Sequence, residues 1–247
     1  MTRKLKALGL ILVGALALVA LAAATGWAGE EEEEEQKGIP KRFWVEKAPA
    51  VVTGNQAKVA NGFTTSKIET TCNETHFTGK VDPMEIKELT ITPTYKGCKT
   101  LNLDTHFELN GCDYTFALKA GRTFTGTEAG SHTSGPVQIK CPDTKSITLK
   151  VTTALGATYC TITIPPQTPT VPEVDTKNTG GTGSTREVLF TFTVTGVHYE
   201  VTGNNDCGET GKTLTDGVID TVVPVTAYED KAGGKQVGFK IYGDDAP

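Results

Sequence analysis

Residues 101–118 read LNLDTHFELNGCDYTFAL, and this stretch decides the fold class. Asn110-Gly111 at its centre is the strongest short-range signal for a β-hairpin, because both central residues of a type I′ turn need φ > 0. A two-residue turn predicts a core face formed by Leu103, Thr105, Phe107, Leu109, Cys112, Tyr114, Phe116 and Leu118. The opposite, wet face would carry Asp104, His106, Glu108, Asp113, Thr115 and Ala117. The stretch therefore predicts an antiparallel hairpin with one buried face.

Alternating runs of Thr with Val, Ile, Phe and Tyr continue on both sides of this stretch, a pattern that favours half-buried strands over helices. In one run, Leu89, Ile91, Pro93 and Tyr95 share a face, and Pro93 indicates an edge or a bulge at its end. The fold class we expect is all-β: an antiparallel β-sandwich, Ig-like or jelly-roll-like, with about a dozen short strands, and a β-barrel as the alternative. The expected strands are 68–77, 86–95, 122–128, 137–141, 147–152, 158–164, 188–195, 197–202, 217–227 and 236–242.

The N-terminus has the features of a signal peptide. A basic start, Thr2 to Lys6, precedes an uncharged apolar run from Ala7 to Ala24, and Gly26-Trp27-Ala28 supplies the small residues of a cleavage site. We expect residues 1–28 to be removed and the mature protein to be secreted and extracellular, or associated with the cell wall. An uncleaved membrane anchor stays open, because about 18 apolar residues can just span a bilayer.

The charge of the mature chain argues against two classes of partner. Removing residues 1–28 leaves 21 basic and 29 acidic residues, a net charge of −8, of which Glu30 to Glu35 supply six negative charges. The rest of the chain is nearly neutral and has no basic patch. We therefore expect neither nucleic acid nor, after cleavage, a membrane as a partner; a cell-wall polysaccharide or another surface protein remains open.

Six cysteines in an exported chain indicate three disulfides. They are Cys72, Cys98, Cys112, Cys141, Cys160 and Cys207. Their spacings include no C-x₂-C pair, so we expect no zinc site. The pairing we expect joins Cys72 to Cys98, Cys141 to Cys160 and Cys112 to Cys207.

Composition divides the mature chain into two parts. Residues 29–49 begin with a run of glutamates and are expected to be an acidic, mostly disordered spacer. Residues 50–247 are expected to form a single β domain, within which 165–185, rich in Pro, Gly and Thr, reads as a linker-like loop. Only Cys207 follows this loop, so one disulfide must cross it if all six cysteines pair. Two lobes, 50–166 and 186–247, are the alternative.

Few residues suggest chemistry. The sequence DCGETGKT, Asp206 to Thr213, approaches a phosphate-binding loop, but its required first Gly is Asp206 and the segment after it reads as a strand. We interpret it as a Gly-rich hairpin loop held by a disulfide. On the wet face of the predicted hairpin, His106, Glu108 and Asp113 form a candidate cation-binding or proton-transfer group, with solvated surface as the favoured interpretation. No other metal site, no cofactor and no catalytic residue is assigned.

Sugar-binding modules usually display exposed aromatic side chains, and few are available here. The one Trp left after cleavage is Trp44, and Tyr95, Tyr199, Tyr228 and Tyr242 are the remaining stacking candidates.

Several cysteine and turn motifs resemble those of a known group of proteins. The motifs are Thr94-Tyr95-Lys96-Gly97-Cys98, Asn110-Gly111-Cys112-Asp113-Tyr114-Thr115-Phe116, Cys141-Pro142 and Cys160-Thr161-Ile162-Thr163-Ile164-Pro165-Pro166-Gln167. They resemble uncharacterised exported, cysteine-containing all-β proteins of high-GC Gram-positive soil bacteria, over residues 60 to 225. The resemblance implies a shared disulfide scaffold and carries over no activity, ligand or catalytic residue.

The expected function is that of a non-enzymatic extracellular or cell-surface structural or interaction protein. A secreted carbohydrate-binding module and a glycan-acting hydrolase are the alternatives. A row of exposed aromatics would favour the former, and a cleft with converging carboxylates and a perturbed pKa the latter.

Overall fold

The computed structural model describes residues 42–118, 132–179 and 183–242. These residues form sixteen strands and two 3₁₀ turns, which confirms the predicted all-β antiparallel class. None of the described segments is a helix long and apolar enough to cross a membrane. The predicted signal peptide, most of the predicted spacer and the predicted strand 122–128 lie outside the described residues. The elements are β1 (Arg42–Val45), β2 (Ala50–Thr64), β3 (Glu69–Val81), β4 (Glu85–Ile86), β5 (Glu88–Lys96), β6 (Cys98–Thr100), β7 (Leu103–Glu108), β8 (Asp113–Ala117), β9 (His132–Lys140), β10 (Ile147–Thr152), β11 (Thr158–Ile164), β12 (Val171–Thr179), η1 (Gly183–Thr185), β13 (Glu187–Gly203), η2 (Asn205–Cys207), β14 (Thr213–Glu229), β15 (Gln236–Val237) and β16 (Phe239–Tyr242).

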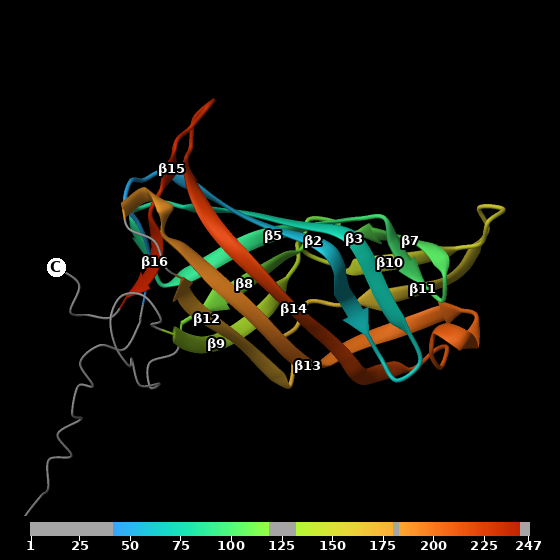
Figure 1. Cartoon of the computed structure of the whole chain (residues 1–247). Coiled ribbons are helices and arrows are strands. Elements are labelled where there is room, and N and C mark those ends of the chain that lie inside the picture. The colour runs from blue at the N-terminus through green and yellow to red at the C-terminus, as the bar shows by residue number, and fades with distance from the viewer. Residues whose placement is uncertain (1–41, 119–131, 180–182, 243–247) are drawn as a thin grey trace, which may run out of the picture. The chain divides into compact units, whose positions relative to one another are not determined.

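Four long strands organise the fold (Figure 1). They lie in the order β3-β2-β14-β13 and have 13, 15, 17 and 17 residues, longer than the short strands expected. Two sheets of shorter strands, β5-β8-β9-β12 and β6-β7-β10-β11, each join β3 at one side and β13 at the other. The result is a sandwich-like fold in which two short sheets share the edge strands of one long sheet.

Each outer long strand changes partner partway along its length. The first half of β13 pairs with β12, from Glu187 to Thr195, and its last residues, from Glu200 to Gly203, pair with β11. Gly196 lies at the change with φ of 73°, a left-handed conformation that a residue with a side chain rarely adopts. Both short sheets therefore share the same two long strands, β3 and β13.

The turn of the predicted hairpin forms, but its two strands do not pair with each other. The Asn110-Gly111 turn forms with φ values of 55° and 84°, and the N–H of Cys112 donates to the carbonyl of Leu109 at 2.9 Å. However, β7 pairs with β6 and β10, whereas β8 pairs with β5 and β9, so the predicted β7–β8 register is wrong. A tight turn fixes where the chain reverses, but the Cys112–Cys141 disulfide and the β8–β9 ladder draw the strand after the turn into the other short sheet.

Burial alternates along strands such as β5, β10 and β11. In β5, Leu89, Ile91 and Pro93 are buried, as predicted, and the pairing of β5 with β8 ends at Ile91, before Pro93. Cys112, Tyr114 and Phe116 are also buried as predicted, whereas Thr115, placed on the wet face by the sequence, is 3% exposed and hydrogen-bonded to Thr90. The sequence therefore predicted the buried faces of these strands correctly even where it predicted the wrong pairing partners.

A small sheet, β16-β1-β4, corrects the predicted domain boundary. Arg42–Val45 was expected to belong to the acidic spacer, but it pairs with β16 and β4. Phe43 and Val45 are fully buried, and the Phe43 ring stacks on Phe190 and Phe239 with centroid distances of 6.0 and 6.2 Å. Burying two such side chains stabilises the fold by about 3–6 kcal/mol, so the domain begins before residue 50.

The predicted loop 165–185 contains a strand. β12 lies between β9 and β13 in one of the short sheets. Its inward residues include Thr176, which donates to the carbonyl of Thr133, and Asn178, whose side chain exchanges two hydrogen bonds with the backbone of Ile241 at 2.8 and 2.9 Å. Polar side chains thus occupy positions that are usually apolar, which is why the hydrophobic pattern did not predict this strand.

All six cysteines form disulfides, which indicates an oxidising, extracellular environment. The Cys72–Cys98 pair is as predicted, and the other two predicted pairs are wrong: the bonds are Cys112–Cys141 and Cys160–Cys207. In both, the partners lie across a ladder or just beyond its end, since Asp113 is opposite Lys140 and Cys160 is opposite Gly203. The Cys160–Cys207 bond crosses 165–185, as expected of one bridge.

Candidate functional site

Four hairpin loops gather at one end of the sandwich, toward the right of Figure 1. They are 65–68, 101–102, 153–157 and 204–212, and we call this region the loop end. Strand registers bring them together: Thr70 is opposite Thr100, Asp104 is opposite Thr152, and Cys160 is opposite Gly203. Loops at the end of a rigid sandwich are a common place for binding residues.

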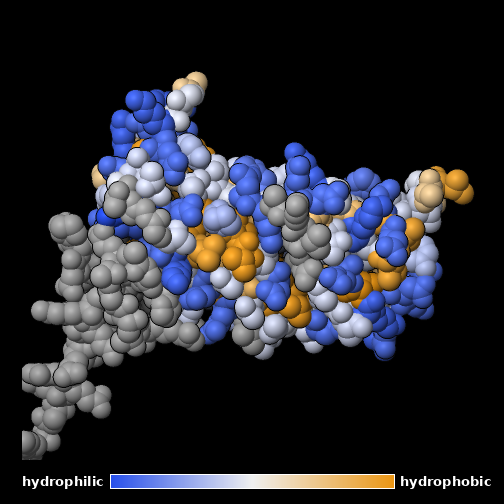
Figure 2. All heavy atoms as spheres, in the orientation of Figure 1, coloured by the Kyte–Doolittle hydropathy of each residue, from blue (hydrophilic) through white to orange (hydrophobic). Residues whose placement is uncertain are grey.

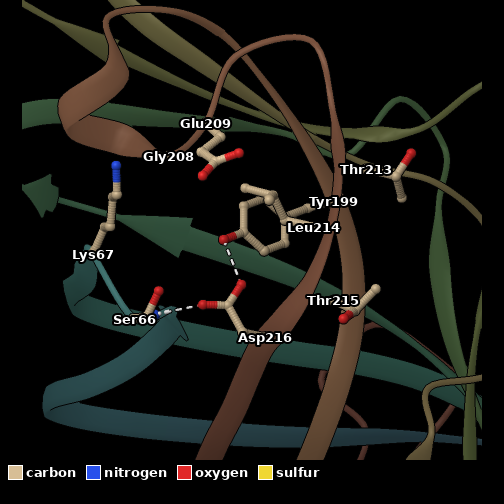
Figure 3. Close-up of a pocket in the computed structure, with 9 residues that line it drawn as sticks. All are labelled: Ser66, Lys67, Tyr199, Gly208, Glu209, Thr213, Leu214, Thr215 and Asp216. Atoms are coloured by element: carbon tan, nitrogen blue, oxygen red, sulfur yellow. Dashed lines mark hydrogen bonds between the residues drawn. The ribbon is translucent and has the colours of Figure 1, made fainter.

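A pocket of about 320 Å³ opens between two of these loops (Figure 3). We call it the loop-end pocket. One wall comes from the turn 65–68, and the other from the end of β13, the 204–212 loop and the start of β14. Its lining is mostly polar, with Leu214 and the Tyr199 ring as apolar components. The size is at the lower end of the range for small-molecule sites.

Asp216 joins the two walls of the pocket. The Tyr199 hydroxyl donates to Oδ1 of Asp216 at 2.8 Å, and the backbone N–H of Ser66 donates to Oδ2 at 2.8 Å. Burial disfavours the charged form of this carboxyl, but the hydrogen bonds from Ser66 and Tyr199 outweigh burial and hold the pKa of Asp216 below its ordinary value. The pocket therefore contains a fixed, ionised carboxylate.

Tyr199 forms the floor of this arrangement. Its side chain is 1% exposed and packs edge-on against Phe63, with ring centroids 5.4 Å apart. Burial, followed by the hydrogen bond to Asp216, raises the pKa of Tyr199 to about 12. The phenol is therefore neutral at physiological pH and serves as a hydrogen-bond donor to Asp216.

Charged side chains line the mouth of the pocket (Figure 3). Lys67 Nζ donates to the carbonyl of Asn205 at 3.3 Å, and Glu209 pairs with Lys212 at 2.6 Å. The hydrogen bond from Lys212 lowers the pKa of the Glu209 carboxyl, and the same contact raises the pKa of Lys212. Both carboxylates of the pocket are thus stabilised in their charged forms.

The sequence DCGETGKT contributes part of the pocket. Its segment forms η2 and the following loop between β13 and β14, held to β11 by the Cys160–Cys207 disulfide. The interpretation of this segment as a hairpin loop held by a disulfide is confirmed. Its role as a pocket wall was missed, because the opposite wall, at Ser66, lies 150 residues away from Asp216 in the sequence.

The candidate cation group of His106, Glu108 and Asp113 does not form. Glu108 lies on β7, where its Oε1 pairs with Lys150 at 2.6 Å, and this contact lowers the pKa of Glu108. Asp113 lies on β8 and accepts a hydrogen bond from Thr92. The group depended on the β7–β8 ladder, and within the described ranges no three His, Cys, Asp or Glu side chains are placed to hold a metal ion.

The candidate stacking aromatics do not form a row in the described part of the chain. Trp44 lies under Lys240, whose Nζ is 4.8 Å from the ring centroid, and Tyr95 stacks on Phe107 at 4.2 Å. Tyr199 is buried, and Tyr228 is exposed on β14. The side chain of Tyr242 lies outside the described residues. Figure 2 shows mostly hydrophilic side chains on the visible face, with scattered apolar patches.

Fold and pocket together define a disulfide-bonded, sandwich-like all-β domain with a polar pocket among its end loops. Comparison with known proteins found no matching family model, no matching curated protein and no matching solved structure.

Proposed function

We propose that the protein is an exported, non-enzymatic interaction protein that binds its ligand at the loop end. The observation that carries this proposal is the meeting of loops 65–68 and 204–212 around a pocket whose walls are joined through Asp216. One of these loops is also held by the Cys160–Cys207 disulfide. A pocket fixed in this way loses little conformational entropy on binding.

Binding is favoured over glycan hydrolysis by the carboxylates of the pocket. The acid catalyst of a glycosidase needs a raised pKa, so that it carries a proton near neutral pH. The pKa values of both Asp216 and Glu209 are below their ordinary values. These carboxylates are suited to accepting hydrogen bonds from a ligand and not to donating a proton to a leaving group.

Co-sedimentation of the purified mature protein, disulfides intact, with cell-wall preparations and insoluble polysaccharides tests the proposal. Capture from culture medium extends the test to soluble surface proteins. We expect saturable binding that the double variant Lys67→Ala, Glu209→Ala weakens. Lys87→Ala is the matched control, since Lys87 is exposed immediately before β5 and does not line the pocket. Binding that is unchanged in the double variant would contradict a role for the loop end.

A further inference from the structure

We propose that the loop-end pocket binds one neutral sugar residue of a saccharide. This inference rests on the proposed function and names the ligand class of the same site. Three properties of the pocket carry it: its charge balance, its mixture of donors and acceptors, and its partly apolar wall.

The charges around the pocket cancel. Asp216 and Glu209 contribute two negative charges, and Lys67 and the Glu209 partner Lys212 contribute two positive ones. An anionic ligand such as phosphate would meet the ionised Asp216, and a cation would meet Lys67. Because each class of ion encounters a like charge, a neutral ligand fits the pocket better.

The polar groups suit hydroxyls, which both donate and accept. The oxygens of Asp216 accept hydrogen bonds from the Ser66 N–H and the Tyr199 hydroxyl, and a carboxylate has about four acceptor positions in all. Lys67 uses one of its three donors on the carbonyl of Asn205. A sugar hydroxyl could therefore donate to Asp216 while a neighbouring hydroxyl accepts from Lys67.

The apolar part of the lining suits the C–H surface of a sugar ring. Half-buried Leu214 supplies apolar surface beside the polar groups (Figure 3), whereas the Tyr199 ring is buried and holds Asp216 in place. Tyr199 cannot shift to follow a ligand, because it is packed against Phe63 and bonded to Asp216. The pocket thus offers the apolar surface of Leu214 next to a fixed carboxylate, and its volume of about 320 Å³ admits one sugar ring, with a longer saccharide continuing into solvent.

Titration of the isotopically labelled protein with soluble probes, followed by amide NMR shifts, tests the ligand class. The neutral probes are the methyl glycosides of glucose, galactose and mannose, and N-acetylglucosamine. Glucuronate, inorganic phosphate and glucosamine are the charged probes. We expect at least one neutral probe to bind in the millimolar range or tighter, with shifts at Ser66, Glu209 and Thr215, and more tightly than any charged probe.

Two variants make the test specific. Asp216→Asn should weaken binding of the neutral probe about tenfold or more, since a hydrogen bond to a charged group is lost. Asp220→Asn, an exposed site on the same strand, should leave it unchanged. Glu209→Gln provides a second pocket variant if Asp216→Asn does not fold.

Either of two results would overturn the sugar assignment: no response to any neutral probe, or tighter binding of a charged probe. If the co-sedimentation described above still depended on Lys67 and Glu209, the loop end would remain the binding site and only its ligand class would be wrong. If co-sedimentation were insensitive to those residues, the proposed function itself would fail.

Discussion

Gln167 is joined to His198 by two hydrogen bonds between its side-chain amide and the His198 backbone. Gln167 Nε2 donates to the carbonyl of His198 at 2.8 Å, and the N–H of His198 donates to Oε1 of Gln167 at 2.7 Å. His198 lies where β13 leaves β12 and has not yet reached β11. The Gln167 amide therefore replaces a missing strand neighbour. The Gln167 backbone also exchanges two hydrogen bonds with Ile139, so one residue connects the junction of the two short sheets.

Gln167→Ala should lower the free energy of unfolding by about 1–3 kcal/mol, because two hydrogen bonds at the junction are lost. Urea unfolding measures this change. Gln167→Glu is an informative second variant. It keeps the shape of the side chain, but its carboxylate cannot donate to the His198 carbonyl. We therefore expect it to lower the free energy of unfolding at neutral pH as well. Equal stability of all three proteins would show that solvent replaces the amide without cost.

Tyr199→Phe should raise the pKa of Asp216 toward its ordinary value. The variant removes the hydroxyl that donates to Oδ1, while the bond from the Ser66 N–H to Oδ2 remains. Carbon-detected NMR of the aspartate carboxyls across acidic pH measures the shift directly. Tyr159→Phe serves as the control, since the Tyr159 hydroxyl bonds to Asp206 and not to Asp216.

Glu229 should make stability depend on pH in the acidic range. Ion pairs with Lys231 and Lys47, both at 2.5 Å, lower its pKa from 4.5 to about 2. A folded-state pKa below the unfolded one means that the contribution is fully present above about pH 4.5 and is lost as the pH falls toward 2.

The melting temperature of the Glu229→Gln variant should therefore change less over this pH range than that of the wild-type protein. Glu88→Gln is a suitable control, because Glu88 is exposed and its ion pair with Lys140 is longer, at 3.6 Å. A wild-type profile that does not change between these pH values would contradict the assigned role of Glu229.

The sequence predicted what depends on local periodicity. Alternation identified the buried faces of β5, β10 and β11, and Asn110-Gly111 identified the turn. The pairing of β7 with β10 and of β8 with β9 was not predictable, because an alternating strand presents the same buried face to any antiparallel neighbour. β12 was missed because Thr176 and Asn178 occupy inward positions through hydrogen bonds and not through hydrophobicity.

The pocket could not be predicted from the sequence, for a different reason. The hydrogen bond from Ser66 to Asp216 joins residues 150 positions apart, and neither residue belongs to a motif. The cysteines gave a partial signal: an even number predicted the bridges, but spacing alone carried no information on which strands would be neighbours.

The Cys160–Cys207 and Cys112–Cys141 disulfides should differ in their effect on the pocket. The two cysteines are 47 positions apart in Cys160–Cys207 and 29 positions apart in Cys112–Cys141. In the chain-entropy account, each stabilises the fold by about 4 kcal/mol. Replacing both cysteines of either bridge by alanine should therefore lower the unfolding free energy by similar amounts.

Their effects on the pocket should not be similar. Cys207 ends η2, and the next residues, Gly208 and Glu209, line the pocket. Removing Cys160–Cys207 should speed amide hydrogen exchange in 204–212 and at Ser66, whose N–H is bonded to Asp216. Removing Cys112–Cys141, which ties β8 to the end of β9, should leave exchange at these amides unchanged apart from the global loss of stability. If both double variants showed the same exchange at the loop end, the pocket wall would be held by the β13–β14 ladder alone, and the disulfide would have no role in shaping the site.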